Sequence, residues 1–136
     1  MVFAGTFESA MRAIDTNVLV RLITRDDFRR VSAAESFIDK GAWVSVLALA
    51  EAAWVLATVY ELTSNELIRA IEMLLEHRDL TLQDADTVTE ALELFRARPA
   101  LGFTDCLMVE LARKAGHLPL GTFDRNLAKV AGTQKL

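Results

Sequence analysis

Residues 42–60, AWVSVLALAEAAWVLATVY, are the segment that best predicts the fold class. AWVSV is short and apolar, as expected of a buried strand, and LALAEAAWVLATVY is long and apolar enough for a largely buried helix. Between Val46 and Val59 a charged residue occurs only once, at Glu51. A strand followed at once by a covering helix is typical of α/β domains with a parallel sheet.

The same alternation continues along the chain. MRAI, AWVSV, LTL and PLGTF predict four short strands, and helices fill the segments between them. Parallel strands joined by helices require right-handed crossovers, which place helices on both faces of the sheet. The predicted fold class is therefore α/β, with one central, mainly parallel sheet. The predicted helices are TNVLVRLI, DDFRRVSAAESFIDKG, LALAEAAWVLATVY, TSNELIRAIEMLLEHR, DADTVTEALELFRARP, FTDCLMVELARKAG and DRNLAKV.

Composition limits the class of protein. The chain has 136 residues, of which 52% are hydrophobic and 25% charged, and this suits one domain with a single core. Its mean hydropathy of +0.25 is high for a small domain and predicts apolar surface reserved for a partner or a second copy. A net charge of −4 argues against a strongly basic protein that coats nucleic acid. It does not argue against a nuclease, because catalytic acids lower the net charge.

The single cysteine, Cys106, rules out an intrachain disulfide and fits a reducing, cytoplasmic compartment. Its apolar neighbours favour a packed core thiol. The apolar runs are shorter than the roughly 18–20 residues that span a bilayer, and the pattern of a secretory signal is missing, so we expect no membrane association. We expect residues 1–10 to be an N-terminal extension or a cloning remnant, and residues 11–136 to form a single domain.

Four carboxylates stand in apolar sequence near the ends of the predicted elements. Asp15 ends RAID, Glu51 interrupts its helix, Asp105 opens a helix, and Asp124 ends PLGTFD. Open parallel sheets carry their sites at the carboxyl ends of strands, so we expect these acids to be drawn to a shared interior edge. Ionised acids gathered in this way need a divalent cation such as Mg²⁺ or Mn²⁺. The sequence therefore predicts a metal-dependent enzyme.

Three of the four acids also have a simpler explanation. Asp15 and Asp124 can cap helices, and an acid in a first helical turn, such as Asp105, complements the helix dipole. Glu51 is harder to explain, because a helix that is apolar on its other sides is normally buried and an unpaired buried glutamate is rare. We therefore expect Glu51 to be buried and functional.

Polar residues beside the acids complete the predicted site. Hydroxyl and amide side chains next to three of the acids can orient a carboxylate or a water, although ordinary caps and turns explain them equally well. These side chains belong to Thr16, Asn17, Thr104 and Thr122.

Basic residues near the acids are candidates for contact with a nucleic-acid backbone. Arg125 directly follows Asp124 and is the strongest of them. Arg21, Arg25 and Arg29 recur every four residues, with Arg30 next to them. For this run, surface pairing such as Asp26 with Arg30 is slightly favoured over phosphate contact.

Four segments in this order, AIDTNVLVR, SVLALAEAAWVL, FTDCLMVELARKAG and GTFDRNLAKV, resemble PIN-domain ribonucleases, most closely the VapC-type toxins of bacterial toxin–antitoxin pairs. The resemblance covers nearly everything from Met11 to Thr133. The extension before Met11 lies outside the pattern, and Cys106 stands where the family often has a small residue. The residues that match the family's four acidic positions and its small hydroxyl position are Asp15, Glu51, Asp105 and Asp124, and Thr122.

The resemblance implies a three-layer α/β/α sandwich with a parallel sheet. It implies a Mg²⁺- or Mn²⁺-dependent endoribonuclease, in which the four acids are the catalytic and metal-binding residues and a metal-activated water hydrolyses RNA. It also implies a homodimer and a cognate antitoxin, a small protein that wraps the toxin and can push an arginine into the acidic site.

Other interpretations stay open from the sequence. A receiver domain also has an acidic Mg²⁺ pocket, but it needs adjacent early acids and here Thr16 follows Asp15. A haloacid dehalogenase-like phosphatase would need an aspartate at Asn17. A non-catalytic module, whose acids only receive an arginine from a bound protein, is the non-enzymatic alternative.

Overall fold

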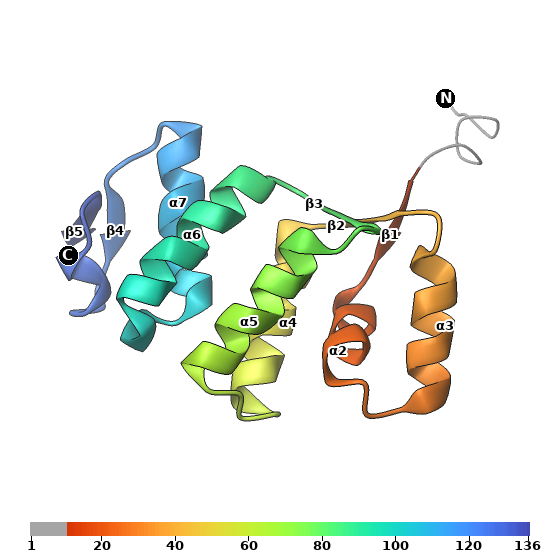
Figure 1. The fold of residues 1–136 in the computed structure, drawn as a ribbon. Helices are drawn as coiled ribbons and strands as arrows, with labels where there is room; N and C mark the ends of the chain where they lie inside the picture. Colours follow the sequence, from red (N-terminus) through yellow and green to blue (C-terminus); the bar gives the residue numbers. More distant parts are fainter. Residues whose placement is uncertain (1–10) are drawn as a thin grey trace.

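The computed structural model describes residues 11–136, which form an α/β fold in which the paired strands are parallel (Figure 1). The first sheet has the order β1-β2-β3, and a second sheet pairs β4 with β5. The predicted α/β class with a parallel sheet is confirmed. The strands are β1 (Arg12–Ile14), β2 (Ala42–Val44), β3 (Leu80–Leu82), β4 (Leu120–Thr122) and β5 (Thr133–Lys135).

The helices lie close to the predicted segments. Within residues 11–136, no helix is long and apolar enough to cross a membrane. The segment DRNLAKV forms only a 3₁₀ turn at Leu127–Lys129, and a second 3₁₀ turn spans Pro99–Leu101. The α-helices are α2 (Thr16–Thr24), α3 (Phe28–Ile38), α4 (Val46–Thr58), α5 (Ser64–Glu76), α6 (Ala85–Ala97) and α7 (Phe103–Ala115).

Local sequence signals fix the helix ends. Before α5, the Thr63 hydroxyl accepts the Glu66 N–H at 3.2 Å, and the Glu66 carboxylate accepts the Thr63 N–H at 2.8 Å. This reciprocal capping box satisfies two backbone donors that the helix itself leaves unpaired. Helix α7 ends at Gly116, whose left-handed backbone (φ 80°) lets its N–H reach the carbonyls of the last turn.

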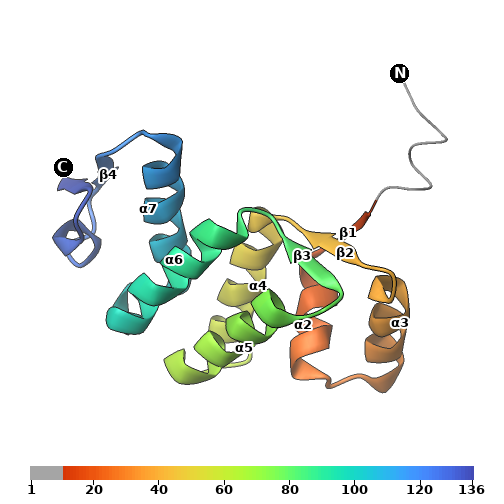
Figure 2. The same cartoon turned by 45° about the horizontal axis from the view of Figure 1, so that its top comes forward.

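The strand arrangement corrects one expectation. The predicted strand PLGTF does not extend the first sheet, because its central residues form β4 and pair with β5. Figures 1 and 2 show this second sheet at the opposite end of the molecule from β1, beyond α4 to α7. The sequence did not predict β5, because Thr133–Lys135 reads TQK and has no apolar alternation.

One apolar core holds α6 and α7 against the N-terminal part of the chain. Fully buried Leu107 of α7 belongs to the same cluster as Leu49 of α4 and Ile71 of α5. Phe95 of α6 meets Phe103 of α7 edge to face, with ring centroids 6.1 Å apart. This packing sets where the end of the chain, including β4, can lie.

Cys106 is part of this core. Its side chain is fully buried, and burial raises the pKa of its thiol to about 12. A thiol with this pKa stays protonated and is a poor nucleophile. The prediction of a packed core cysteine is confirmed.

Two neighbouring residues of α7 test the importance of this core. Leu107 is 2% exposed and Met108 is 46% exposed. Leu107→Ala should lower the free energy of unfolding by about 2–5 kcal/mol, because it removes buried contacts and leaves a cavity. Met108→Ala should lower it much less. Urea unfolding followed by circular dichroism measures both, and equal losses would contradict the packing of α7.

Candidate functional site

Asp15 and Glu51 line one cavity of about 650 Å³ between the start of α2 and the exposed face of α4. Asp15 directly follows β1, and its Oδ1 accepts the backbone N–H of Val18 at 3.1 Å. The capping role that the sequence suggested for Asp15 is therefore present. It engages one carboxylate oxygen and leaves the other for a ligand.

The polar neighbours of Asp15 lie in the same place. Thr16 and Asn17 both line the cavity that holds Asp15 and Glu51. The Thr16 hydroxyl donates to the Ala48 carbonyl at 3.5 Å, a long contact between the start of α2 and α4. Thr16 and Asn17 thus lie beside the first acidic pair, and their role in orienting a carboxylate or a water stays a prediction.

Glu51 is exposed, which corrects the expectation that it is buried. Helix α4 buries one face made largely of alanines and leucines and leaves another open. On the open face Leu47, Glu51 and Trp54 follow one another about one turn apart. Leu47 is 68% exposed and Trp54 61% exposed. The prediction failed because apolar composition on every side of a helix was taken to mean burial on every side.

Asp105 and Asp124 form a second acidic pair, on the C-terminal part of the chain. Asp105 lies in the first turn of α7 and is half-buried, and Asp124 comes just after β4. Burial raises the pKa of the Asp105 carboxyl above its ordinary value, and the negative charge of Asp124 raises this pKa further. The two acids are therefore electrostatic neighbours.

The residues around this second pair hold the loop after β4 in place. Asp124 Oδ1 accepts the N–H of Asn126 at 2.7 Å and that of Leu127 at 2.9 Å, so it caps the following 3₁₀ turn. The Thr122 hydroxyl accepts the N–H of Asp124 at 3.0 Å. Arg125 is exposed on the same loop.

Thr104 lies beside Asp105, and both line a cavity of about 390 Å³ together with Trp54 of α4. Trp54 therefore lies on the exposed face of α4 next to Glu51 and also lines the cavity that contains Asp105. The sequence analysis did not single out Leu47 or Trp54. Their position one turn on either side of Glu51 was the signal that could have found them.

The two acidic pairs do not meet within one chain. Among residues 11–136, no group of three or more Asp, Glu, His or Cys side chains is placed to hold a metal ion. The expected shared interior site is therefore not formed, because β4 pairs with β5 and does not join the first sheet. The catalytic assignment of the four acids stays a prediction.

The donor chemistry of each pair nevertheless fits a hard divalent cation. Mg²⁺ prefers carboxylate oxygens, keeps several waters and is commonly bound by one or two carboxylates. Asp15 and Asp124 each use only Oδ1 in the hydrogen bonds formed among residues 11–136. The raised pKa of Asp105 reflects partial burial beside another acid, and a cation would offset both effects.

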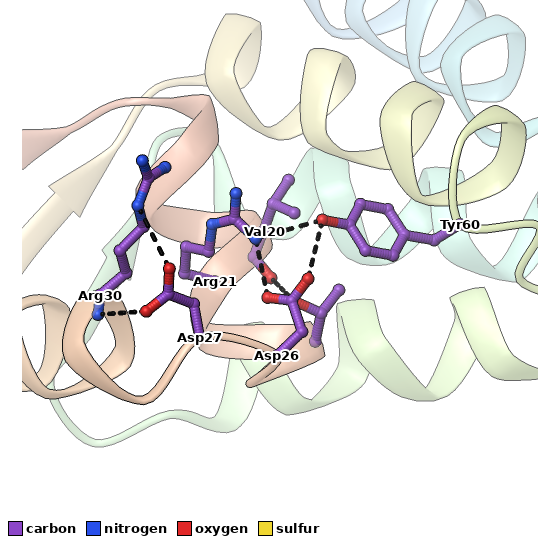
Figure 3. A network of polar contacts seen from close by, with 7 residues as sticks. Val20, Arg21, Asp26, Asp27, Arg30 and Tyr60 are labelled. Carbon is purple, nitrogen blue, oxygen red and sulfur yellow. Dashed lines mark hydrogen bonds and ion pairs between the residues drawn. The ribbon is translucent and has the colours of Figure 1, made fainter.

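A polar network next to the first pair fixes the turn between α2 and α3 (Figure 3). Arg21 contacts Asp26 at 2.7 Å, and the Tyr60 hydroxyl donates to the other oxygen of Asp26 at 3.2 Å. The hydrogen bond from Arg21 lowers the pKa of Asp26 below its ordinary value. Arg21 thus joins α2 to the segment after α4.

Surface pairing, the favoured explanation of the arginine run, is observed with different partners. The predicted pair of Asp26 with Arg30 is wrong, since Arg30 contacts Asp27 at 3.5 Å. Arg25 contacts Glu35 at 3.0 Å. Arg21 and Arg30 both line a cavity of about 420 Å³ with Asp15, so these two arginines of the run lie beside the first acidic pair.

Comparison with known proteins identifies one family. The family model described as PIN domain matches residues 13–133, which is most of the chain and includes all four acids. No curated protein and no solved structure shows a significant match to the chain.

The raised pKa of Asp105 leads to a prediction about stability, to be tested in buffer that contains EDTA. Because this pKa is raised on folding, ionisation of Asp105 costs stability as the pH rises through the raised value. Asp105→Asn should therefore increase the free energy of unfolding at neutral pH. The increase should vanish below the ordinary pKa of 3.8, where the acid is protonated in both states.

Asp86→Asn is the matched control, because Asp86 is an exposed acid in the first turn of α6. Its replacement should leave stability unchanged or lower it slightly, since a first-turn acid complements the helix dipole. Urea unfolding at neutral and acidic pH measures both variants. Equal stabilisation by the two would show that the effect does not come from the setting of Asp105.

Proposed function

Because the chain belongs to the PIN-domain family, whose members are generally metal-dependent nucleases, we propose that it is a metal-dependent endoribonuclease and the toxin of a toxin–antitoxin pair. The observation that carries the proposal is the pair of carboxylates, Asp15 and Glu51, in one cavity beside β1. The second pair, Asp105 and Asp124, supplies the other two acids. The family match favours this function over a receiver or a phosphatase.

The proposed cofactor is Mg²⁺ or Mn²⁺, with Asp15 and Glu51 as one pair of candidate ligands and Asp105 and Asp124 as the other. Such an ion, when bound, lowers the pKa of a coordinated water and offsets the charge of a phosphodiester.

The remaining residues would position the RNA and the carboxylates. Arg125 is exposed beside Asp124, and Arg30 lines a cavity with Asp15, so both can contact phosphate groups. Thr16, Asn17, Thr104 and Thr122 would orient the acids or the attacking water. The products, as in the family that the chain resembles, would carry 5′-phosphate and 3′-hydroxyl ends.

The proposed partners are a cognate antitoxin and a second copy of the chain, in the cytoplasm. Large apolar side chains on the surface support binding to other proteins: Phe28 is 86% exposed and Phe123 is 80% exposed. Leu47 and Trp54 add to this surface beside Glu51. An antitoxin that covers them could place an arginine against the exposed carboxylate of Glu51.

Glu51→Gln tests the proposed function. Glu51 is exposed, so the variant should fold normally. RNA cleavage with Mn²⁺ should fall by more than about 100-fold, since even loss of a residue that supports a metal ligand costs about 10–100-fold. Excess EDTA should abolish cleavage by the wild type. Gel analysis of a mixed RNA pool measures these rates.

Glu90→Gln is the matched control, because Glu90 is also an exposed helical glutamate but lines a different cavity. Its cleavage rate should equal that of the wild type. Cleavage by Glu51→Gln at the wild-type rate would contradict the proposal. Stabilisation by Mn²⁺ without any cleavage would instead favour the non-catalytic binding module.

A further inference from the structure

A cavity of about 390 Å³ lies where α4, α5, the 3₁₀ turn before α7 and the start of α7 meet. Apolar side chains, such as those of Leu62 and Phe103, form most of its wall. The polar side chains that line it belong to Ser64, Thr104 and Asp105. Small-molecule sites typically have this form, an apolar cavity of about 300–1,000 Å³ with a small number of polar groups.

Trp54 gives this cavity an aromatic wall that is open to solvent. The side chain lines the cavity and is nevertheless 61% exposed. Large apolar side chains gathered on a surface commonly mark the place where a ligand or partner binds. Nucleobases stack on aromatic side chains, and tryptophan offers the largest aromatic surface of any residue. An exposed indole that lines a cavity can therefore hold a flat aromatic ring.

Polar groups in the same cavity suit the edge of a nucleobase. Ser64 and Thr104 are half-buried, and a hydroxyl can donate to or accept from any base edge. Helix α7 begins after Gly102 without a side-chain cap, so its first N–H groups lack a side-chain acceptor. A Cβ at Gly102 would meet nothing within 4 Å, so the space beside this helix end is open. The cavity thus combines apolar walls for the faces of a base with donors and acceptors for its edge.

We propose that this cavity binds one unpaired nucleobase of the RNA, stacked on Trp54. Trp54 follows Glu51 by three residues, about one helical turn, and lines the same cavity as Asp105. A base held there brings the phosphates of its own nucleotide beside one acid of each pair. This inference rests on the proposed function and adds a base-binding residue to it. The favoured substrate is RNA whose base at the cleavage site is not paired.

The size and charge of the cavity favour a base over other occupants. A helix of a partner protein binds in a long apolar groove, whereas this cavity has the volume of a site for one small group. A phosphate would be repelled by the carboxylate of Asp105, but a base is uncharged and avoids this repulsion. A metal ion is not favoured either, because Asp105 is the only carboxylate that lines the cavity.

Tryptophan fluorescence tests the stacking without any nuclease activity. The chain has two tryptophans, and Trp43→Phe in β2 leaves Trp54 as the only one. This variant is titrated in Ca²⁺, a hard cation that binds the same oxygen ligands, with oligo(A), with oligo(U) and with the duplex that the two strands form. Each single strand should quench the fluorescence of Trp54. The duplex should quench it much less, because its bases stay stacked and paired inside the helix.

Substitutions in α4 test the site by RNA affinity. Trp54→Ala should weaken the binding of single strands by about 10-fold, the loss expected for one base stacked on an aromatic side chain, and Trp54→Phe should keep most of the affinity. Ala57→Leu should also weaken binding, because it fills the cavity from an exposed position of α4. Val59→Ala is the matched control, since Val59 is 65% exposed at the end of the same helix and does not line the cavity. Fluorescence anisotropy of a labelled strand measures all four variants.

The outcomes separate this site from the proposed function. The base site is overturned if single strands leave the fluorescence of Trp54 unchanged, if the duplex quenches it as strongly, or if Trp54→Ala binds RNA as well as Val59→Ala does. Cleavage with Mn²⁺ at the same rate by the wild type and by Trp54→Ala would also overturn the base site and leave the nuclease intact. A wild type that cleaves no RNA, but binds single strands through Trp54, would refute the nuclease and leave the base site standing.

Discussion

The packing of α7 against α4 is the constraint on which the rest of the molecule depends. It buries Phe103 and Leu107 and places Asp105 in a cavity with Trp54. It also directs the chain that follows α7 away from the first sheet, so that β4 pairs with β5. The division of the acids into two pairs is a consequence of this helix contact.

The elements that local signals determine were predicted from the sequence. The first three strands and the six α-helices all follow from apolar periodicity and from cap residues close together in the chain. Strand pairing depends on contacts between distant segments, and residue patterns of three-residue strands do not specify it. For this reason β5 and the separate second sheet were missed.

The same distinction applies to the candidate site: features set by neighbouring residues were predicted, and features set by contacts between distant segments were not. The places of Asp15 beside β1 and of Asp124 beside β4 were predicted, because both follow directly from strand ends. The exposure of Glu51 was not, since it depends on which parts of the chain cover α4. Small alanines on the buried face of α4 leave the larger Leu47 and Trp54 on its open face. The amino-acid composition of α4 alone does not show which of its faces is buried.

Electrostatics and packing together favour the separation of the four acids into two pairs. Asp105 already has a raised pKa with one acid as neighbour, so two further carboxylates would raise the cost of ionisation again. Keeping Asp15 and Glu51 in a different cavity avoids that cost.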